Sequence, residues 1–140
     1  MMKKMRKNII ILAMFLFLAV PVSVYAKSST RSVTLSADYA TGKGKLECKF
    51  QWKIFGKDSA DAYTEITKRE KNSPTNYRVA VRLETWKTSK KCTKYSYKNG
   101  RNKASLSASN ADVYQYASRH SLDDNSNTKE LAARSIYAPE

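Results

Sequence analysis

The sequence predicts an all-β protein: a small antiparallel β-sandwich, or an open barrel, of about six to eight strands, preceded by a cleaved signal peptide. Three observations lead to this prediction. The N-terminus is cationic and then apolar, several short segments alternate apolar with polar residues, and turn-forming residues separate these segments.

The N-terminus has the layout of a secretory signal peptide, because four cations precede an apolar run over residues 9–20 and the small Ala26 suits cleavage after it. Those cations are Lys3, Lys4, Arg6 and Lys7. The run is shorter than the roughly 20 residues of a spanning helix, although a retained anchor is the alternative. We expect a signal peptide over 1–26 and one all-β domain over 27–140, secreted to the extracellular side and either free or associated with the cell surface.

The clearest strand signal is the alternation over residues 45–55, and similar series are found at 33–39 and 77–85. We expect the apolar members of these series to face the core. They are Val33, Leu35, Ala37, Tyr39, Leu46, Cys48, Phe50, Trp52, Ile54, Tyr77, Val79, Val81, Leu83 and Thr85. "TGKG" at 41–44 is expected to form a turn and "GKDSADA" at 56–62 a loop.

Further strands are predicted at 63–69, 92–97 and 101–107. Asn99-Gly100 is a strong signal for a type I′ turn that would join the last two as a hairpin. Residues 111–120 favour a strand over a helix because of their tyrosines and valine, whereas 131–137 suits either.

The hairpin creates a conflict of direction. A two-residue loop places Tyr95 and Tyr97 on the core face, and it then points Cys92 to the polar face with Lys94 and Lys98. Either a bulge restores the direction of Cys92, or the two tyrosines face solvent. The alternation alone leaves both arrangements open.

Cys48 and Cys92 are the only cysteines, and both lie in the part expected to be exported. An even number of cysteines in an oxidising compartment predicts one disulfide, which would stabilise the fold by roughly 4 kcal/mol. Two reduced thiols are the alternative. A metal or redox role is disfavoured because the chain has no CxxC and one histidine. No metal and no cofactor is expected.

The charge predicts an anionic partner. Four of the 26 lysines and arginines lie in the signal peptide, so the exported part keeps 22 cations against 12 acids. Such a balance favours an anionic cell-wall polymer or a membrane surface, while nucleic acid is possible but not favoured. Charge decides neither the fold nor the oligomeric state.

The candidate binding residues lie in one segment, 86–103, which has cations and aromatics but no acid. On the predicted hairpin, Lys94, Lys98, Arg101 and Lys103 would project from one face. The candidate set is Lys87, Lys90, Lys91, Lys94, Tyr95, Tyr97, Lys98, Arg101 and Lys103. A solvated face whose lysines protect an edge strand is the competing interpretation.

Catalysis is not expected. His120 is the only histidine and is interpreted as a surface residue, and no nucleophile motif is present. A serine triad with Asp123 or Asp124 can be drawn on paper, as can a small nuclease that pairs His120 with a glutamate and an arginine. Neither has a supporting pattern, so no catalytic residue is assigned.

A signal peptide followed by a short basic all-β domain resembles, in outline, bacterial wall-binding modules and secreted β-sandwich bacteriocins. No motif matches residue by residue, so the resemblance transfers no functional residue. The sequence predicts an exported, non-enzymatic binding protein whose basic surface engages an anionic cell-envelope component. A bacteriocin-like toxin is the alternative, and a small secreted nuclease is a more distant one.

Overall fold

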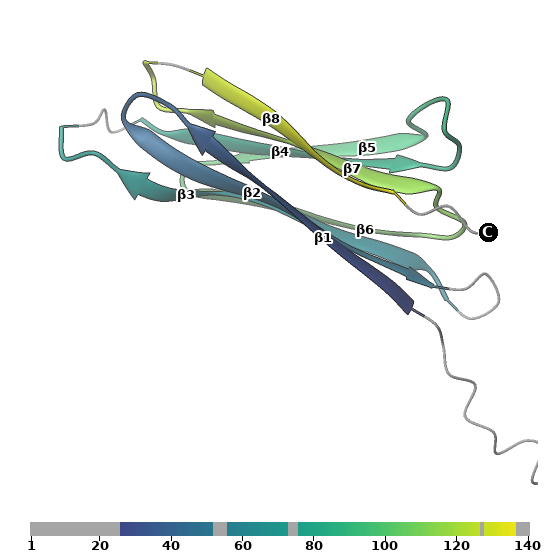
Figure 1. The fold of residues 1–140 in the computed structure, drawn as a ribbon. Coiled ribbons are helices and arrows are strands. Elements are labelled where there is room, and N and C mark those ends of the chain that lie inside the picture. The colour runs from purple at the N-terminus through teal and green to yellow at the C-terminus, as the bar shows by residue number, and fades with distance from the viewer. Residues whose placement is uncertain (1–25, 52–55, 73–75, 127, 137–140) are drawn as a thin grey trace, which may run out of the picture.

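In the computed structural model, residues 26–51, 56–72, 76–126 and 128–136 are described, and they form two four-stranded antiparallel sheets (Figure 1). The first sheet has the order β1-β2-β3-β6 and the second has the order β5-β4-β7-β8. Their bounds are β1 Ala26–Ser36, β2 Ala40–Gln51, β3 Asp58–Arg69, β4 Arg78–Trp86, β5 Lys94–Gly100, β6 Lys103–Asn110, β7 Gln115–Asp123 and β8 Thr128–Ile136.

The sandwich prediction is confirmed, and the sheets do not close into a barrel. Residues 1–25 of the predicted signal peptide, together with Trp52 and Ile54, lie outside the described residues. Within the described part, no helix has the length and apolar character needed to cross a membrane.

The core lies between the sheets and consists of residues that alternate along the strands. The predicted inward positions of β4 are all buried, as are Leu46, Cys48 and Phe50 of β2. Phe50 packs against Tyr116 of β7 with the ring centroids 5.8 Å apart. Burial raises the pKa of Tyr116 to about 12, and its hydroxyl donates to the Asp58 carbonyl at 2.9 Å. Tyr39 is an exception, since it lies in a turn and 39% of it is exposed.

The first two strands begin and end at other residues than predicted. "TGKG" lies within β2, and the connection between β1 and β2 is made by residues 37–39, where the Ala37 N–H donates to the Ala40 carbonyl. Most of "GKDSADA" belongs to β3, because Ala60 and Ala62 are buried in the core. Both predictions were wrong because polar residues alternate with small residues there, and local composition then indicates a loop.

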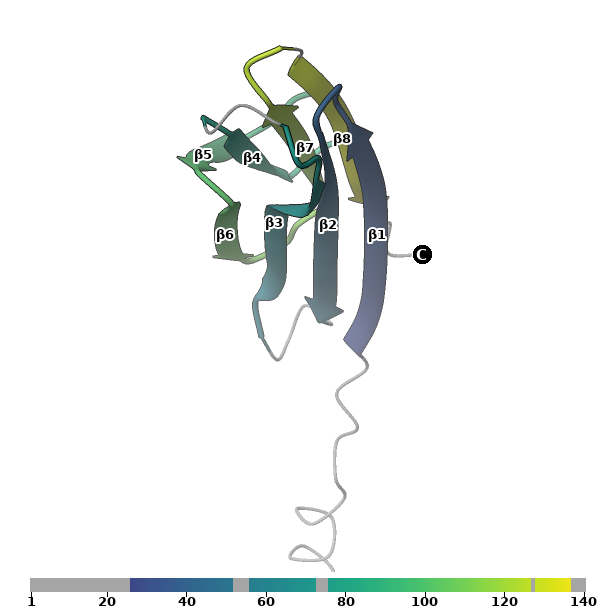
Figure 2. The ribbon, with the colours of Figure 1, turned by 90° about the vertical axis from the view of Figure 1, so that its left-hand side faces the viewer.

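The predicted hairpin at Asn99-Gly100 was also wrong. β5 and β6 are consecutive, but they belong to different sheets, and Figure 2 shows them at the same side of the sandwich. β5 pairs with β4, whereas β6 pairs with β3. Among the described glycines none has a positive φ, so Gly100 does not make the type I′ turn that the dipeptide favours.

The C-terminal part consists of strands. β7 confirms the strand expected within 111–120, and it continues to Asp123, so the loop is shorter than the polar sequence suggested. β8 decides between the two alternatives for 131–137 as far as Ile136. Asp124 lies in the loop between β7 and β8. Its buried carboxylate holds this loop in place, because it accepts hydrogen bonds from the backbone N–H groups of Tyr39 and Ser126.

The disulfide prediction was wrong, because Cys48 and Cys92 are not bonded to each other. Cys48 is buried in β2 of the first sheet, while Cys92 lies in the loop before β5, next to the second sheet. The Cys92 thiol donates to the Lys94 carbonyl at 3.2 Å. Cys48 thus lies in a core strand and Cys92 in a loop, a placement that sequence spacing does not reveal.

Thiol titration tests this arrangement. Without reduction, the native protein is expected to react quickly at the partly exposed Cys92 and slowly at Cys48, which is 2% exposed. Denaturation should make both thiols reactive. A denatured, unreduced protein with no reactive thiol would contradict the structure and restore the disulfide.

Candidate functional site

Among the strands whose side-chain burial is described, β5 is the most exposed, and its residues 94–99 are exposed on both faces. Tyr95 and Tyr97 are 59% and 61% exposed, more than any other large hydrophobic side chain in the described chain. In register, they lie beside Glu84 and Arg82 of β4, on the outer face of the second sheet. The second arrangement left open by the sequence is therefore correct: the tyrosines face solvent.

The other face of β5 explains where its lysines lie. Lys94, Ser96 and Lys98 are in register with core residues of β4, yet all three are exposed. β6 contacts β4 more extensively than it contacts β5, so the first sheet covers the inner face of β5 only in part. A small cavity of about 170 Å³ lies at this edge, between β5 and residues 107–110 of β6. A lysine can occupy an inward position there because it still reaches water.

The candidate residues form a cationic rim around β5. We use this name for Lys87, Lys90, Lys91, Lys94, Lys98 and Arg101, which are exposed on β5 and in its two flanking loops. Within the described residues, none of these six forms an ion pair. Their fields therefore add along one edge and remain available to an anionic partner.

Lys103 does not join the rim. It begins β6 in the first sheet, where its Nζ lies 3.4 Å from a Glu65 carboxylate oxygen and 4.6 Å from the centroid of the Tyr63 ring. The prediction that Lys94, Lys98, Arg101 and Lys103 share one face was wrong. Lys94 and Lys98 are on β5 and Lys103 is on β6, and these two strands belong to different sheets, so their faces are not continuous.

Behind the tyrosines, the outer face of the second sheet holds a buried carboxylate. Glu84 is only 4% exposed, because neighbouring side chains cover it. The Nε atoms of Arg82 and Arg119 lie 3.0 Å and 3.6 Å from its Oε1, and the Trp86 indole donates to Oε2 at 3.0 Å. A buried charge needs such partners, and here one acid fixes the positions of two arginines.

This pairing also orients a tyrosine. The Arg82 guanidinium carbon lies 4.0 Å from the centroid of the Tyr95 ring, which is a cation–π contact. Because Glu84 holds Arg82, the Tyr95 ring is supported from the sheet side and its orientation is restricted. The outer face thus presents a partly preorganised aromatic surface beside the cationic rim.

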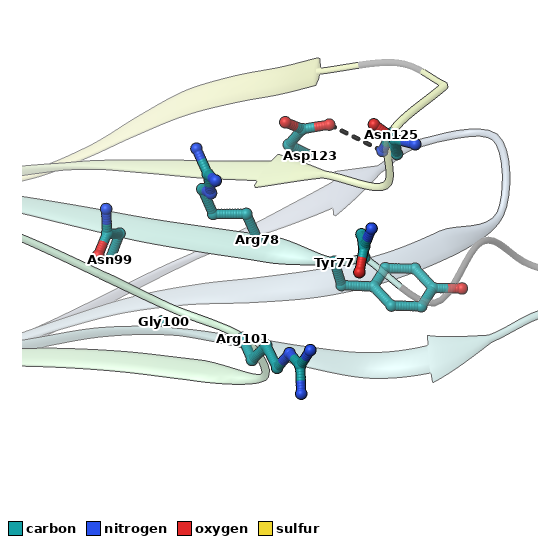
Figure 3. Close-up of a pocket in the computed structure, with 8 residues that line it drawn as sticks. Tyr77, Arg78, Asn99, Gly100, Arg101, Asp123 and Asn125 are labelled. Atoms are coloured by element: carbon teal, nitrogen blue, oxygen red, sulfur yellow. Dashed lines mark hydrogen bonds between the residues drawn. The ribbon is translucent and has the colours of Figure 1, made fainter.

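At one end of β5 the surface is hollowed into a cavity of about 750 Å³. Figure 3 shows Arg78 of β4 between Asn99 of β5 and Asp123 of β7, with Arg101 next to Gly100. The lining residues are Asn76, Tyr77, Arg78, Asn99, Gly100, Arg101, Asp123 and Asn125. The walls are therefore rich in amide and guanidinium groups, which donate hydrogen bonds.

His120 is buried, so its interpretation from sequence as a surface residue was wrong. Its Nδ1 and Nε2 lie 2.8 Å and 2.7 Å from the hydroxyls of Thr64 and Ser118. Since Thr64 already donates its proton to the Ala80 carbonyl, the network assigns the proton of the ring to Nδ1. Burial lowers the pKa of His120 to about 4. Ser118 and His120 resemble a nucleophile and its base, but both are completely buried and cannot meet a substrate.

Sequence reasoning missed Arg78, Arg82, Glu84 and Arg119 as candidates for a binding site. The first three were recognisable as polar positions of an amphipathic strand. The part that these three residues play in the site depends on Tyr95, Asn99 and Arg119. Those partners lie on other strands, and only the register places them beside β4.

Among the described residues, no group of three histidines, cysteines or acids is placed to hold a metal ion. Comparisons with protein-family models, with curated proteins and with solved structures find no match to this chain.

Proposed function

We propose that this chain is an exported, non-enzymatic binding protein that uses the cationic rim and the adjacent tyrosines to hold an anionic component of a cell envelope. The observation that carries the proposal is β5 itself, a strand exposed on both faces with unpaired lysines on one and two solvent-facing tyrosines on the other. A strand that only needed protection from aggregation would require the lysines but not the exposed aromatic rings.

The two kinds of side chain act differently. The rim attracts anionic material over a distance and makes binding sensitive to salt, since exposed charges are screened within about 8–10 Å at physiological ionic strength. The tyrosines make short-range contacts with rings or apolar groups, and these contacts survive higher salt. A polymer with both negative groups and rings would bind the cationic rim and the tyrosines at the same time.

A matched pair of variants tests this function. Lys87, Lys90, Lys94 and Lys98 are changed together to glutamine, and the control changes Lys43, Lys49, Lys57 and Lys71, which are equally exposed. Both variants lose the same charge. The rim variant is expected to weaken co-sedimentation with isolated cell walls at least tenfold more than the control does, because local fields add.

Equal losses in the two variants would show that net charge alone drives binding and would overturn the proposed site. In the salt series, the component that resists salt should disappear in Tyr95→Ala and Tyr97→Ala proteins, which should stay folded because these rings are largely exposed. Killing of sensitive cells by the purified protein would favour the toxin alternative, and degradation of RNA would favour the nuclease.

A further inference from the structure

We infer that the cavity at the end of β5 is a subsite for a sugar that carries an oxyanion, either a phosphate or a carboxylate. This inference rests on the proposed function and specifies the chemistry of the ligand. It starts from the continuity of the outer face, where Tyr95, Tyr97 and Asn99 alternate along β5 and the last of them lines the cavity. A ligand lying over the tyrosines can therefore reach the cavity along the same face of β5.

The lining of the cavity includes two arginines, Arg78 and Arg101. Arg78 lies opposite Asp123 in the register of β4 and β7, but no ion pair joins them within 4 Å. The Asp123 carboxylate instead accepts the Asn125 N–H at 2.8 Å through Oδ1. Arg101 likewise has no carboxylate partner in the described chain. Two guanidinium groups, neither of them in an ion pair, and one carboxylate thus line the hollow, so its charged side chains leave a net positive charge, and guanidinium is well suited to bind an oxyanion.

The remaining groups indicate that the ligand also has hydroxyls. The side chains of Asn76, Asn99 and Asn125 can each donate and accept hydrogen bonds, and the second oxygen of Asp123 is an acceptor only. A carboxylate next to bound phosphate would be repelled unless the ligand also supplies a donor, as a sugar hydroxyl does. This pattern disfavours a bare polyphosphate or nucleic-acid backbone, and it favours a sugar ring with one anionic group.

The tyrosines agree with this class. Sugar rings have apolar C–H faces that pack against exposed aromatic rings, while their hydroxyls bind planar polar side chains such as amides and carboxylates. Both kinds of group are present here, on one strand and in that order. The ligand is therefore expected to be an anionic glycan that lies along β5 and places its charged group between Arg78 and Arg101.

The test is an NMR titration of the mature protein with glucose 6-phosphate, glucuronate, glucose and inorganic phosphate. The amide signals of Asn99, Gly100, Arg101 and Asn125 should shift and saturate with at least one of the anionic sugars. Glucose and inorganic phosphate should each bind at least about tenfold more weakly, because each lacks half of the interactions. The stronger of glucose 6-phosphate and glucuronate identifies the oxyanion.

Three variants sharpen the result. The Arg78→Gln, Arg101→Gln double variant should lose the saturable shifts, whereas a Lys43→Gln, Lys49→Gln control with the same loss of charge should keep them. The Asp123→Asn variant should bind the anionic sugar less well but inorganic phosphate as well or better. The inference is overturned if inorganic phosphate matches the sugar phosphate, if no probe saturates, or if the control loses as much as the double variant.

The outcome is separable from that of the proposed function. Cell-wall binding that depends on the cationic rim, without saturable shifts at the cavity, would overturn the sugar subsite and leave the envelope role intact. Saturable sugar binding in the expected order, without any binding to cell walls, would support the subsite and remove the envelope role.

Discussion

Replacing Gly44 with alanine is expected to lower the free energy of unfolding by about 3–5 kcal/mol, through overpacking and the loss of buried hydrogen bonds. Gly44 lies in β2 and faces the imidazole of His120 on the opposite sheet. A Cβ at this position would lie 2.6 Å from Cδ2 and 2.7 Å from Nδ1 of His120, and closer still to Cγ. The ring would have to move, and its hydrogen bonds to Thr64 and Ser118 would be lost.

Denaturant unfolding of three proteins measures this effect: the wild type, Gly44→Ala, and Lys43→Ala as an exposed neighbour that should change stability by less than about 0.5 kcal/mol. A double-mutant cycle identifies the cause. In a His120→Ala background the same glycine change should cost less than about 1 kcal/mol, because the obstructing ring is gone. An equal cost in both backgrounds would mean that the His120 ring is not what Gly44 accommodates.

Acidification from pH 6.5 to pH 4 is expected to destabilise the fold by about 3 kcal/mol through His120 alone. Burial lowers the pKa of this histidine from 6.5 to about 4 in the folded state. Between these values the unfolded chain binds a proton that the folded chain does not. Stability from this group is therefore complete above pH 6.5 and is lost progressively as the pH falls towards 4.

The measurement is the free energy of unfolding as a function of pH for the wild type and for His120→Gln. Carboxylates titrate in both proteins, so they cancel in the difference. The wild type is expected to be clearly more stable at pH 7, and its advantage should shrink steadily between pH 6.5 and pH 4. Parallel pH profiles would show that His120 is not a buried neutral group.

The strands that were predicted well are those in which one face is buried and the other is wet. Along β2, Leu46, Cys48 and Phe50 are buried and alternate with the exposed Glu47 and Lys49. Alternation is a local property, because successive side chains of a strand point to opposite faces. It can therefore be recognised without knowing which strand lies alongside.

The failures have a different origin. Asn99-Gly100 suits a tight hairpin, yet the chain uses the connection after Gly100 to pass from one sheet to the other. A turn dipeptide states only what the backbone finds easy locally, while the pairing of β5 with β4 and of β6 with β3 depends on contacts between distant residues. The same limitation explains the disulfide, since an even number of cysteines does not show whether the fold brings two sulfurs within bonding distance.

The candidate site was found in part. The segment 86–103 was recognisable because it contains cations and aromatics without an acid, and its exposed residues are found along one edge. Its geometry was not recognisable. Glu84 is polar in sequence but buried in the fold, and its arginine partners come from β4 and β7, which are far apart in the chain.

The sequence by itself determined that this is an all-β protein with an unusually basic segment, because alternation and charge are properties of neighbouring residues. Only the tertiary structure decided that Tyr95 and Tyr97 face water, that Lys103 leaves the rim, and that His120 is buried against Gly44. These outcomes depend on which strands pair, in which register and in which sheet. Such choices are made by the packing of residues that are distant in sequence, so no local pattern records them.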